Sequence, residues 1–223
     1  MIMRLRSAIE KTDTGKRLLK DRRFRLILFA VMSMGWNLVY AVFNALLGLI
    51  GQSAWFAVMS VYYAVLGLMK LLVLSSRGKL PGKSTAKRTM TVTGTGMFLL
   101  AGILSVIVKL TISNAVGRSY PIAVMIAIAA FTFGIVIKAI VNAVQAHRHG
   151  DLFWVMLRNI SLASAAGSVL ALERSMMSTF GSSTDSFTYT MEGVSGLVSF
   201  LFVVLLGTSM IVRAIRMGEG KDA

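Results

Sequence analysis

The chain has 223 residues, of which 56% are apolar and only 15% are charged, against roughly 25% charged residues in an ordinary soluble domain. One soluble core cannot hide so much apolar surface, and the lack of cysteine excludes disulfides and thiolate metal sites. The formal net charge of +15 would suggest nucleic acid in a soluble protein. Beside this apolar background it indicates membrane topology instead, because Lys and Arg gather in cytoplasmic loops.

Residues 1–23 form a basic leader ahead of the first apolar segment. No cleavage site of the A-x-A type ends it, and the apolar stretch that follows is too long for a signal peptide, so we expect the leader to be retained. Ile2, Leu5 and Ile9 share one face of a helix, which fits an amphipathic helix at the cytoplasmic membrane surface. A solvated leader that only enforces topology is the simpler alternative.

Six later stretches are each apolar over about 20 residues, the length that crosses a hydrocarbon core of about 30 Å. Turn and helix-breaking residues separate them, as at 51–53, at Pro81 and in the polar run 181–186. We therefore predict an all-α bundle of six transmembrane helices near residues 24–50, 54–76, 90–113, 121–146, 152–174 and 192–217.

The positive charges on the two sides of these spans predict their orientation. The segments on the side of both termini carry eighteen of the 24 Lys and Arg residues, including the loop 77–88. The opposite loops carry only Arg118 and Arg174. Both termini should therefore be cytoplasmic, in a multi-pass protein of the cell membrane.

The two halves of the chain are weakly similar at a shift of 98 residues. This shift aligns Tyr40–Asn44 with Lys138–Asn142, and Trp55-Phe56 with Phe153-Trp154. Each half then holds three spans, so the second half must cross the membrane in the opposite sense to the first. We expect repeats at 24–113 and 121–217, an outer linker at 114–120 and a tail at 218–223. Chance alignment of apolar helices is the alternative.

From Asn37 to Lys70 the spacing resembles the first two spans of the cation diffusion facilitators, the zinc and manganese antiporters. Asn37, Asn44, Gly48 and Ser53 fall at that family's intervals, and Asn44 stands where the family often has Lys. Residues 138–172 are similar to its fourth and fifth spans. The resemblance implies a six-span bundle with both termini inside.

The metal chemistry of that family does not follow, because its ligand pairs are replaced here. The pair on the second span corresponds to Tyr62 and Leu66, and the pair on the fifth span to Ile160 and Ser164, none of which ligates zinc. We expect no cytoplasmic metal-binding domain after the sixth span, and neither a metal nor another cofactor. Residues 160–165 and 206–214 are also similar to uncharacterised small six-span bacterial membrane proteins, which implies no known activity.

Four cations lie within the predicted spans. Lys70 and Lys109 are near span ends, where we expect long side chains to extend to the membrane surface. Lys138 and Arg158 lie about two turns from a cytoplasmic helix end, and Asp151 is close enough in sequence to reach Lys138. The last two cations either anchor their helices at the interface or contact an anion or substrate at the inner mouth.

Glu173, Arg174 and Glu192 flank the predicted outer loop, and we expect them to be interfacial charges rather than proton carriers. No carboxylate is predicted deep in a span, which argues against a proton pump or a divalent-cation site. His147 and His149 on a basic loop are a weak metal signal. Because no set of acid, base and nucleophile is visible, we do not expect an enzyme.

Uncharged polar residues are the candidates for a solute pathway. Asn37, Tyr40 and Asn44 are spaced by three and four residues, so they form one polar stripe on the first span. Asn142 is the repeat partner of Asn44. The other candidates, on facing helices, are Tyr62, Tyr63, Asn159, Ser161 and Ser164. Interhelical hydrogen bonds of single residues are the simpler explanation.

The sequence therefore predicts a small transporter or facilitator of an unidentified solute, which is not zinc, with Asn44, Asn142 and Tyr62 among the solute contacts. A channel is one alternative, and a non-transporting scaffold that binds lipid through its leader is another. The expected partners are the lipid bilayer, anionic lipid at the leader and a second copy of the chain in a homodimer. Nucleic acid is not expected as a partner.

Overall fold

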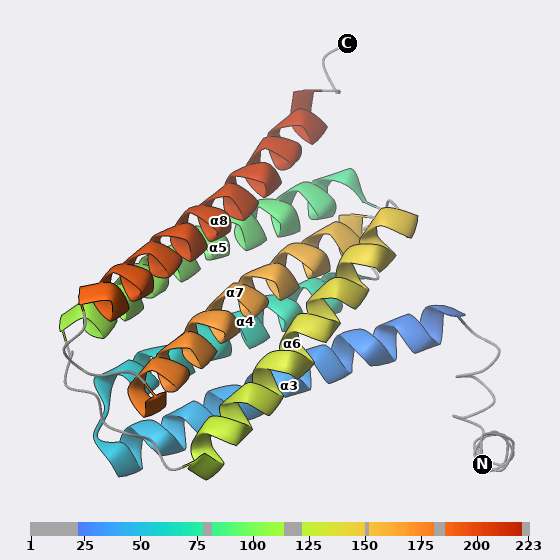
Figure 1. Cartoon of the computed structure of the whole chain (residues 1–223). Coiled ribbons are helices and arrows are strands. Elements are labelled where there is room, and N and C mark those ends of the chain that lie inside the picture. The colour runs from blue at the N-terminus through green and yellow to red at the C-terminus, as the bar shows by residue number, and fades with distance from the viewer. Residues whose placement is uncertain (1–21, 78–81, 114–121, 150–151, 181–185, 220–223) are drawn as a thin grey trace, which may run out of the picture.

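The computed structural model describes residues 22–77, 82–113, 122–149, 152–180 and 186–219, which form six helices and no strand (Figure 1). Each helix contains an apolar stretch of 20 to 30 residues, long enough to cross a membrane. The predicted six-span, all-α fold is confirmed, and the chain is a multi-pass membrane protein in contact with lipid. The helices are α3 (Arg22–Gly51), α4 (Ala54–Ser76), α5 (Lys83–Ser113), α6 (Ile122–His149), α7 (Leu152–Phe180) and α8 (Ser186–Glu219).

Several sequence predictions fall on other parts of the chain. The leader up to residue 21, the outer linker 114–120 and Asp151 lie outside the described residues. We call the end of the bundle that holds the start of α3 the inner end, and the opposite end the outer end, after the predicted orientation.

The turn between α3 and α4 lies at the predicted break 51–53. Gln52 has a φ of 47°, the left-handed conformation that often ends a helix, and Ser53 is extended. The Ser53 N–H donates to the Gly48 carbonyl at 3.1 Å, which satisfies a carbonyl in the last turn of α3. A Cβ on Gly48 would lie 3.1 Å from the backbone nitrogen of Ala57, so glycine permits the close start of this hairpin.

Two helices are longer than the apolar segments that predicted them. α5 begins at Lys83 rather than near residue 90, and α8 begins at Ser186 rather than near residue 192. With 31 and 34 residues, they are about 46 and 51 Å long at 1.5 Å per residue, which exceeds a hydrocarbon core of about 30 Å. Hydropathy marks the part of a helix inside lipid, whereas polar residues continue the helix beyond it.

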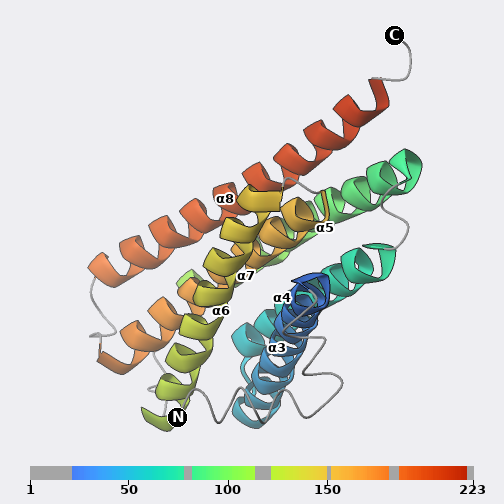
Figure 2. The ribbon, with the colours of Figure 1, turned by 90° about the vertical axis from the view of Figure 1, so that its right-hand side faces the viewer.

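The helices pack mainly as three neighbouring pairs, α3 with α4, α6 with α7 and α5 with α8 (Figures 1 and 2). α4 and α7 meet between these pairs. Of the residues in the apolar stretch of each helix, 67% are buried in α7 and 44% in α4, but only 22% in α3, α6 and α8. The three peripheral helices α3, α6 and α8 expose large apolar side chains instead, including Leu49, Ile50, Phe133 and Leu205, as contact with lipid requires.

Glycines let α5 and α8 approach closely. A Cβ on Gly207 would lie 2.9 Å from the Met97 Cβ and 3.3 Å from the Gly94 carbonyl oxygen. A Cβ on Gly94 would in turn lie 3.4 Å from the Gly207 carbonyl oxygen. Backbone therefore packs against backbone at this crossing, where a larger side chain has no room.

Replacing Gly207 with Val should lower the free energy of unfolding by about 1–3 kcal/mol, because the new side chain must push α5 away from α8. Thermal unfolding in detergent micelles measures this change. Gly102→Val is the matched control on α5, since no atom lies within 4 Å of its Cβ position. Equal stability of the two variants would contradict the close crossing.

Candidate functional site

A polar stripe runs along the face of α3 that is turned into the bundle. It consists of Ser33, Asn37, Tyr40 and Asn44, which are at most 3% exposed. Spacings of four, three and four residues place them on one face of the helix. Three of the four were predicted from the sequence. Ser33 was missed, although its position one turn before Asn37 extends the same pattern.

Lys70 of α4 meets the inner end of this stripe. Its Nζ donates a hydrogen bond to the Ser33 Oγ at 2.9 Å, and the residue is only 2% exposed. The expectation that Lys70 extends to the membrane surface is therefore wrong, because its ammonium is held inside the bundle. Within a single span the sequence gives no sign of this, since the accepting hydroxyl belongs to another helix.

Lys138 of α6 lies on the same part of α3. Its Nζ is 4.5 Å from the centre of the Trp36 ring and 3.5 Å from the Met32 carbonyl oxygen. The half-buried Arg158 of α7 donates from its Nε to the Oδ1 of Asn159 at 3.2 Å. Lys138 thus contacts α3, whereas the hydrogen bond of Arg158 to Asn159 stays on α7.

In the middle of the stripe, α3 is joined to α7. The Ser164 Oγ donates to the Asn37 Oδ1 at 3.2 Å, and both residues are 1% exposed. Asn159 and Ser161, which were also predicted for the pathway, are buried on α7. The structure therefore brings a predicted stripe residue and a predicted facing residue into direct contact.

Three tyrosines of α3 and α4 lie fully buried beside this contact. The rings of Tyr40 and Tyr63 meet edge to face, with their centres 4.5 Å apart. The Tyr62 hydroxyl instead donates to the Ala163 carbonyl of α7 at 2.7 Å. Tyr63 thus faces the stripe, and Tyr62 fastens α4 to α7.

Two of the three predicted solute contacts, Asn44 and Tyr62, form separate hydrogen bonds, and the third is Asn142. The Asn44 amide donates to the carbonyl of Tyr40 on its own helix at 2.8 Å. The Tyr62 hydroxyl is bonded to α7, and the side chain of Asn142 lies outside what the structure describes.

Several polar atoms along the stripe are buried without a hydrogen-bond partner among the described residues. They include the Nδ2 of Asn37 and the hydroxyls of Tyr40 and Tyr63. The side chain of Asn44 is near the Tyr40 hydroxyl and that of Ser168 is near the Tyr63 hydroxyl, but neither pair reaches hydrogen-bond geometry. An unpaired buried polar group costs about 1–3 kcal/mol, so these three atoms need an explanation.

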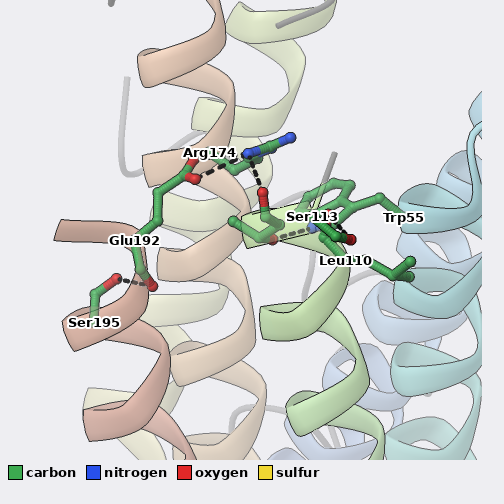
Figure 3. A network of polar contacts seen from close by, with 7 residues as sticks. Trp55, Leu110, Ser113, Arg174, Glu192 and Ser195 are labelled. Atoms are coloured by element: carbon green, nitrogen blue, oxygen red, sulfur yellow. Dashed lines mark hydrogen bonds and ion pairs between the residues drawn. The ribbon is translucent and has the colours of Figure 1, made fainter. Parts of the chain in front are cut away.

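A second polar network closes the outer end of the bundle (Figure 3). Arg174 of α7 forms an ion pair with Glu192 of α8 at 2.9 Å and donates to the Thr111 carbonyl of α5 at 3.1 Å. The Nε1 of Trp55 donates to the Thr111 Oγ1 at 3.0 Å. Four helices therefore meet here. A cavity of about 10 Å³, room for roughly one water molecule, lies between these residues and Glu173.

Glu192 is 5% exposed, so the expectation that it is an interfacial charge is wrong. α8 begins a turn and a half before this residue, which places the carboxylate between helices rather than in a loop. The Arg174 guanidinium then offsets its charge. The sequence contains the two opposite charges, but their distance depends on how α7 and α8 pack.

The positions where the resemblance to cation diffusion facilitators would place metal ligands are buried inside the bundle. Tyr62, Leu66, Ile160 and Ser164 are all at most 1% exposed on α4 and α7. Their two hydroxyl groups donate to Ala163 and Asn37. No group of three or more His, Cys, Asp or Glu side chains comes together in the part of the chain that the structure describes.

Neither a protein-family model nor a curated protein sequence matches this chain. The resemblance to cation diffusion facilitators therefore depends on residue spacing alone. What is established is a small polytopic membrane protein with six apolar helices.

Replacing Glu192 with Gln should lower the free energy of unfolding by about 3 kcal/mol, because it removes the carboxylate that offsets the Arg174 charge between the helices. Unfolding in detergent micelles measures this loss. The double variant Arg174→Met with Glu192→Leu removes both charges and should recover most of the stability. A double variant less stable than Glu192→Gln would refute the assigned role of the ion pair.

Proposed function

We propose that this protein is a small facilitator that carries a polar solute across the cell membrane along the stripe of α3. The observation that supports this function is the set of unpaired atoms on Asn37, Tyr40 and Tyr63 at the centre of the bundle. Apolar side chains at these positions would avoid a cost of about 1–3 kcal/mol each. A solute with acceptor oxygens would supply the missing hydrogen bonds.

The chemistry of the stripe favours a neutral polar or anionic solute. The Asn37 Nδ2 is a donor, and the two tyrosine hydroxyls donate or accept. The carboxylates described within the spans, Glu173 and Glu192, lie in the outer network instead. A bare metal cation would find few of the oxygen ligands that it needs along the stripe.

The packing around the stripe supports a route between two hairpins. α3 is packed extensively on α4, and α6 on α7, whereas the backbones of α3 and α6 are further apart and meet through side chains, such as Phe131 on the Tyr40 ring. Gly134 of α6 lies beside Trp36 of α3, at 3.1 Å from its Cβ position to the ring. Separation of the two hairpins would have to break the hydrogen bonds from Ser164 to Asn37 and from Tyr62 to Ala163, and it would open the stripe and leave each hairpin intact.

The pattern of helix contacts supports the inverted repeat that such carriers commonly have. If α3, α4 and α5 correspond to α6, α7 and α8, the α3–α4 interface matches α6–α7, and α4–α5 matches α7–α8. Of the remaining interfaces, α5–α8, α4–α7 and α3–α6 each join a helix to its own counterpart, whereas α5–α7 has no α4–α8 interface of similar size to match it. A two-fold axis in the membrane plane would produce this arrangement except for the α5–α7 interface.

The aromatic pairs aligned by the 98-residue shift also correspond in geometry. Trp55 and Phe56 at the start of α4 have ring centres 5.0 Å apart at 80°. Phe153 and Trp154 at the start of α7 have centres 5.0 Å apart at 83°. All four side chains are at most 5% exposed. The shared geometry supports the repeat independently of hydropathy.

Each aromatic pair is also near an arginine at the end of the other half's second helix. Arg77 of α4 lies 4.7 Å from the centre of the Phe153 ring. At the opposite end of the bundle, Arg174 of α7 and Trp55 both bond to Thr111. The two ends thus have related architecture, as expected of an inverted repeat.

Transport is tested by the swelling of proteoliposomes in a stopped-flow light-scattering experiment. The solutes are glycerol, urea and acetamide, and chloride, nitrate and formate as potassium salts with valinomycin. Asn37→Leu and Tyr63→Phe should each slow the permeant solute about threefold to tenfold, because each removes one hydrogen bond of about 0.7–1.4 kcal/mol.

Ser105→Ala is the control for the transport experiment, since this serine is exposed on α5 and bonds to its own helix at Gly102. It should leave the rate unchanged. If no solute enters faster than into protein-free liposomes, or if both stripe variants equal the wild type, the facilitator is refuted.

A further inference from the structure

We propose that Lys70, Lys138 and Ser33 form a binding site for a small anion at the inner end of the polar stripe. The ligand class comprises halides, nitrate and small carboxylates. Any role of this site in transport rests on the proposed function, whereas binding itself is measured apart from transport.

The first reason is the environment of Lys70. A charged side chain inside a membrane helix is costly to bury, and Lys70 is 2% exposed. An ammonium has three hydrogens to donate, and the structure pairs it with the Ser33 hydroxyl. A neutral hydroxyl offsets only part of a buried charge, so an anion would stabilise this side chain further.

The second reason is that another cation lies beside it. Lys70 contacts the Ser33 hydroxyl and Lys138 the neighbouring Met32 carbonyl, so the two ammonium groups meet the same turn of α3 and their charges repel. The groups that contact the Lys138 Nζ are the Trp36 ring and the Met32 carbonyl, both neutral. Among the described residues, no carboxylate forms an ion pair with either lysine. One anion between the two ammonium groups would replace repulsion with two attractions.

The third reason is the position of the site. Lys138 is half-buried and stands one turn before Val141, where the apolar span of α6 ends, so the site is near the inner membrane surface. The neighbouring Trp36 Nε1 and Asn37 Nδ2 are buried donors that lack a hydrogen-bond partner among the described residues. A small anion therefore meets further donors toward the centre of the bundle.

A free anion fits this site better than a lipid headgroup. A phosphate at the membrane surface could approach Lys138, but Lys70 is covered by the surrounding helices. An ion that contacts both lysines must be small enough to enter between α3, α4 and α6. Halides, nitrate and formate satisfy this condition, and they can be exchanged freely in solution.

Iodide is the probe for the experiment, because it quenches tryptophan on contact and Trp36 lies against Lys138. The chain has three tryptophans, so Trp55→Phe and Trp154→Phe leave Trp36 as the reporter. Potassium iodide is titrated at constant ionic strength into this protein in dodecyl maltoside micelles. Quenching should saturate and should be reversed by chloride.

The variants Lys70→Met and Lys138→Met should each weaken the saturating phase about tenfold, which is one lost interaction of about 1.4 kcal/mol. Ser33→Ala is a milder variant that should weaken iodide binding about threefold. It keeps the test valid if the lysine variants do not fold. Lys109→Met is the matched control, because this lysine is exposed on α5 and should not affect quenching. Gel filtration and helical circular dichroism verify that each variant is folded.

The proposal is overturned if quenching rises linearly without saturation, or if both lysine variants bind as the wild type does. It is also overturned if iodide binds only after Asp151→Asn, since the carboxylate of Asp151 would then be the group that occupies the site. If iodide does not bind saturably but urea or glycerol flux is intact, only the anion site is refuted. Saturable binding without flux of any solute refutes the facilitator and leaves the site.

Discussion

The structure depends on one constraint, which is that lipid offers no hydrogen bonds, so polar side chains between the helices must be satisfied by one another. The bonds that result each join two helices and select which helices meet. Lys70 with Ser33 joins α4 to α3, and Ser164 with Asn37 joins α7 to α3. The hydroxyl of Tyr62 joins α4 to α7, and the Arg174 ion pair joins α7 to α8. α7 takes part in three of these four, in agreement with its central place.

The spans could be predicted because about 20 apolar residues are a property of one segment alone. The polar stripe could be predicted for the same reason, since its spacing lies within α3. What could not be predicted is the register between helices. Lys70 and Glu192 are near the ends of apolar segments and suggest contact with the membrane surface, yet both are buried by residues of another helix. Neither periodicity nor charge counting contains that information.

In this bundle, buried polar atoms with a hydrogen-bond partner are explained by packing, whereas those without one are the candidates for solute contacts. The hydroxyl groups of Tyr62 and Ser164 occupy positions where the resemblance to cation diffusion facilitators would place metal ligands, and both are bonded to protein. These interhelical hydrogen bonds therefore explain why the two hydroxyl groups are buried. No such bond explains the unpaired atoms of Asn37 and Tyr63, although they are equally buried. A pathway is consequently better sought along the stripe of α3 than between α4 and α7.

The two ends of the bundle treat buried charge in opposite ways. At the outer end, Glu192 offsets Arg174, and Glu173 adds a second carboxylate to the network. At the inner end, Lys70 and Lys138 contact neutral groups among the described residues, and no carboxylate offsets them there. The field inside the bundle should thus attract anions toward the inner end and bind them least at the outer end. The two lysines inside the bundle would then favour an anion as the solute.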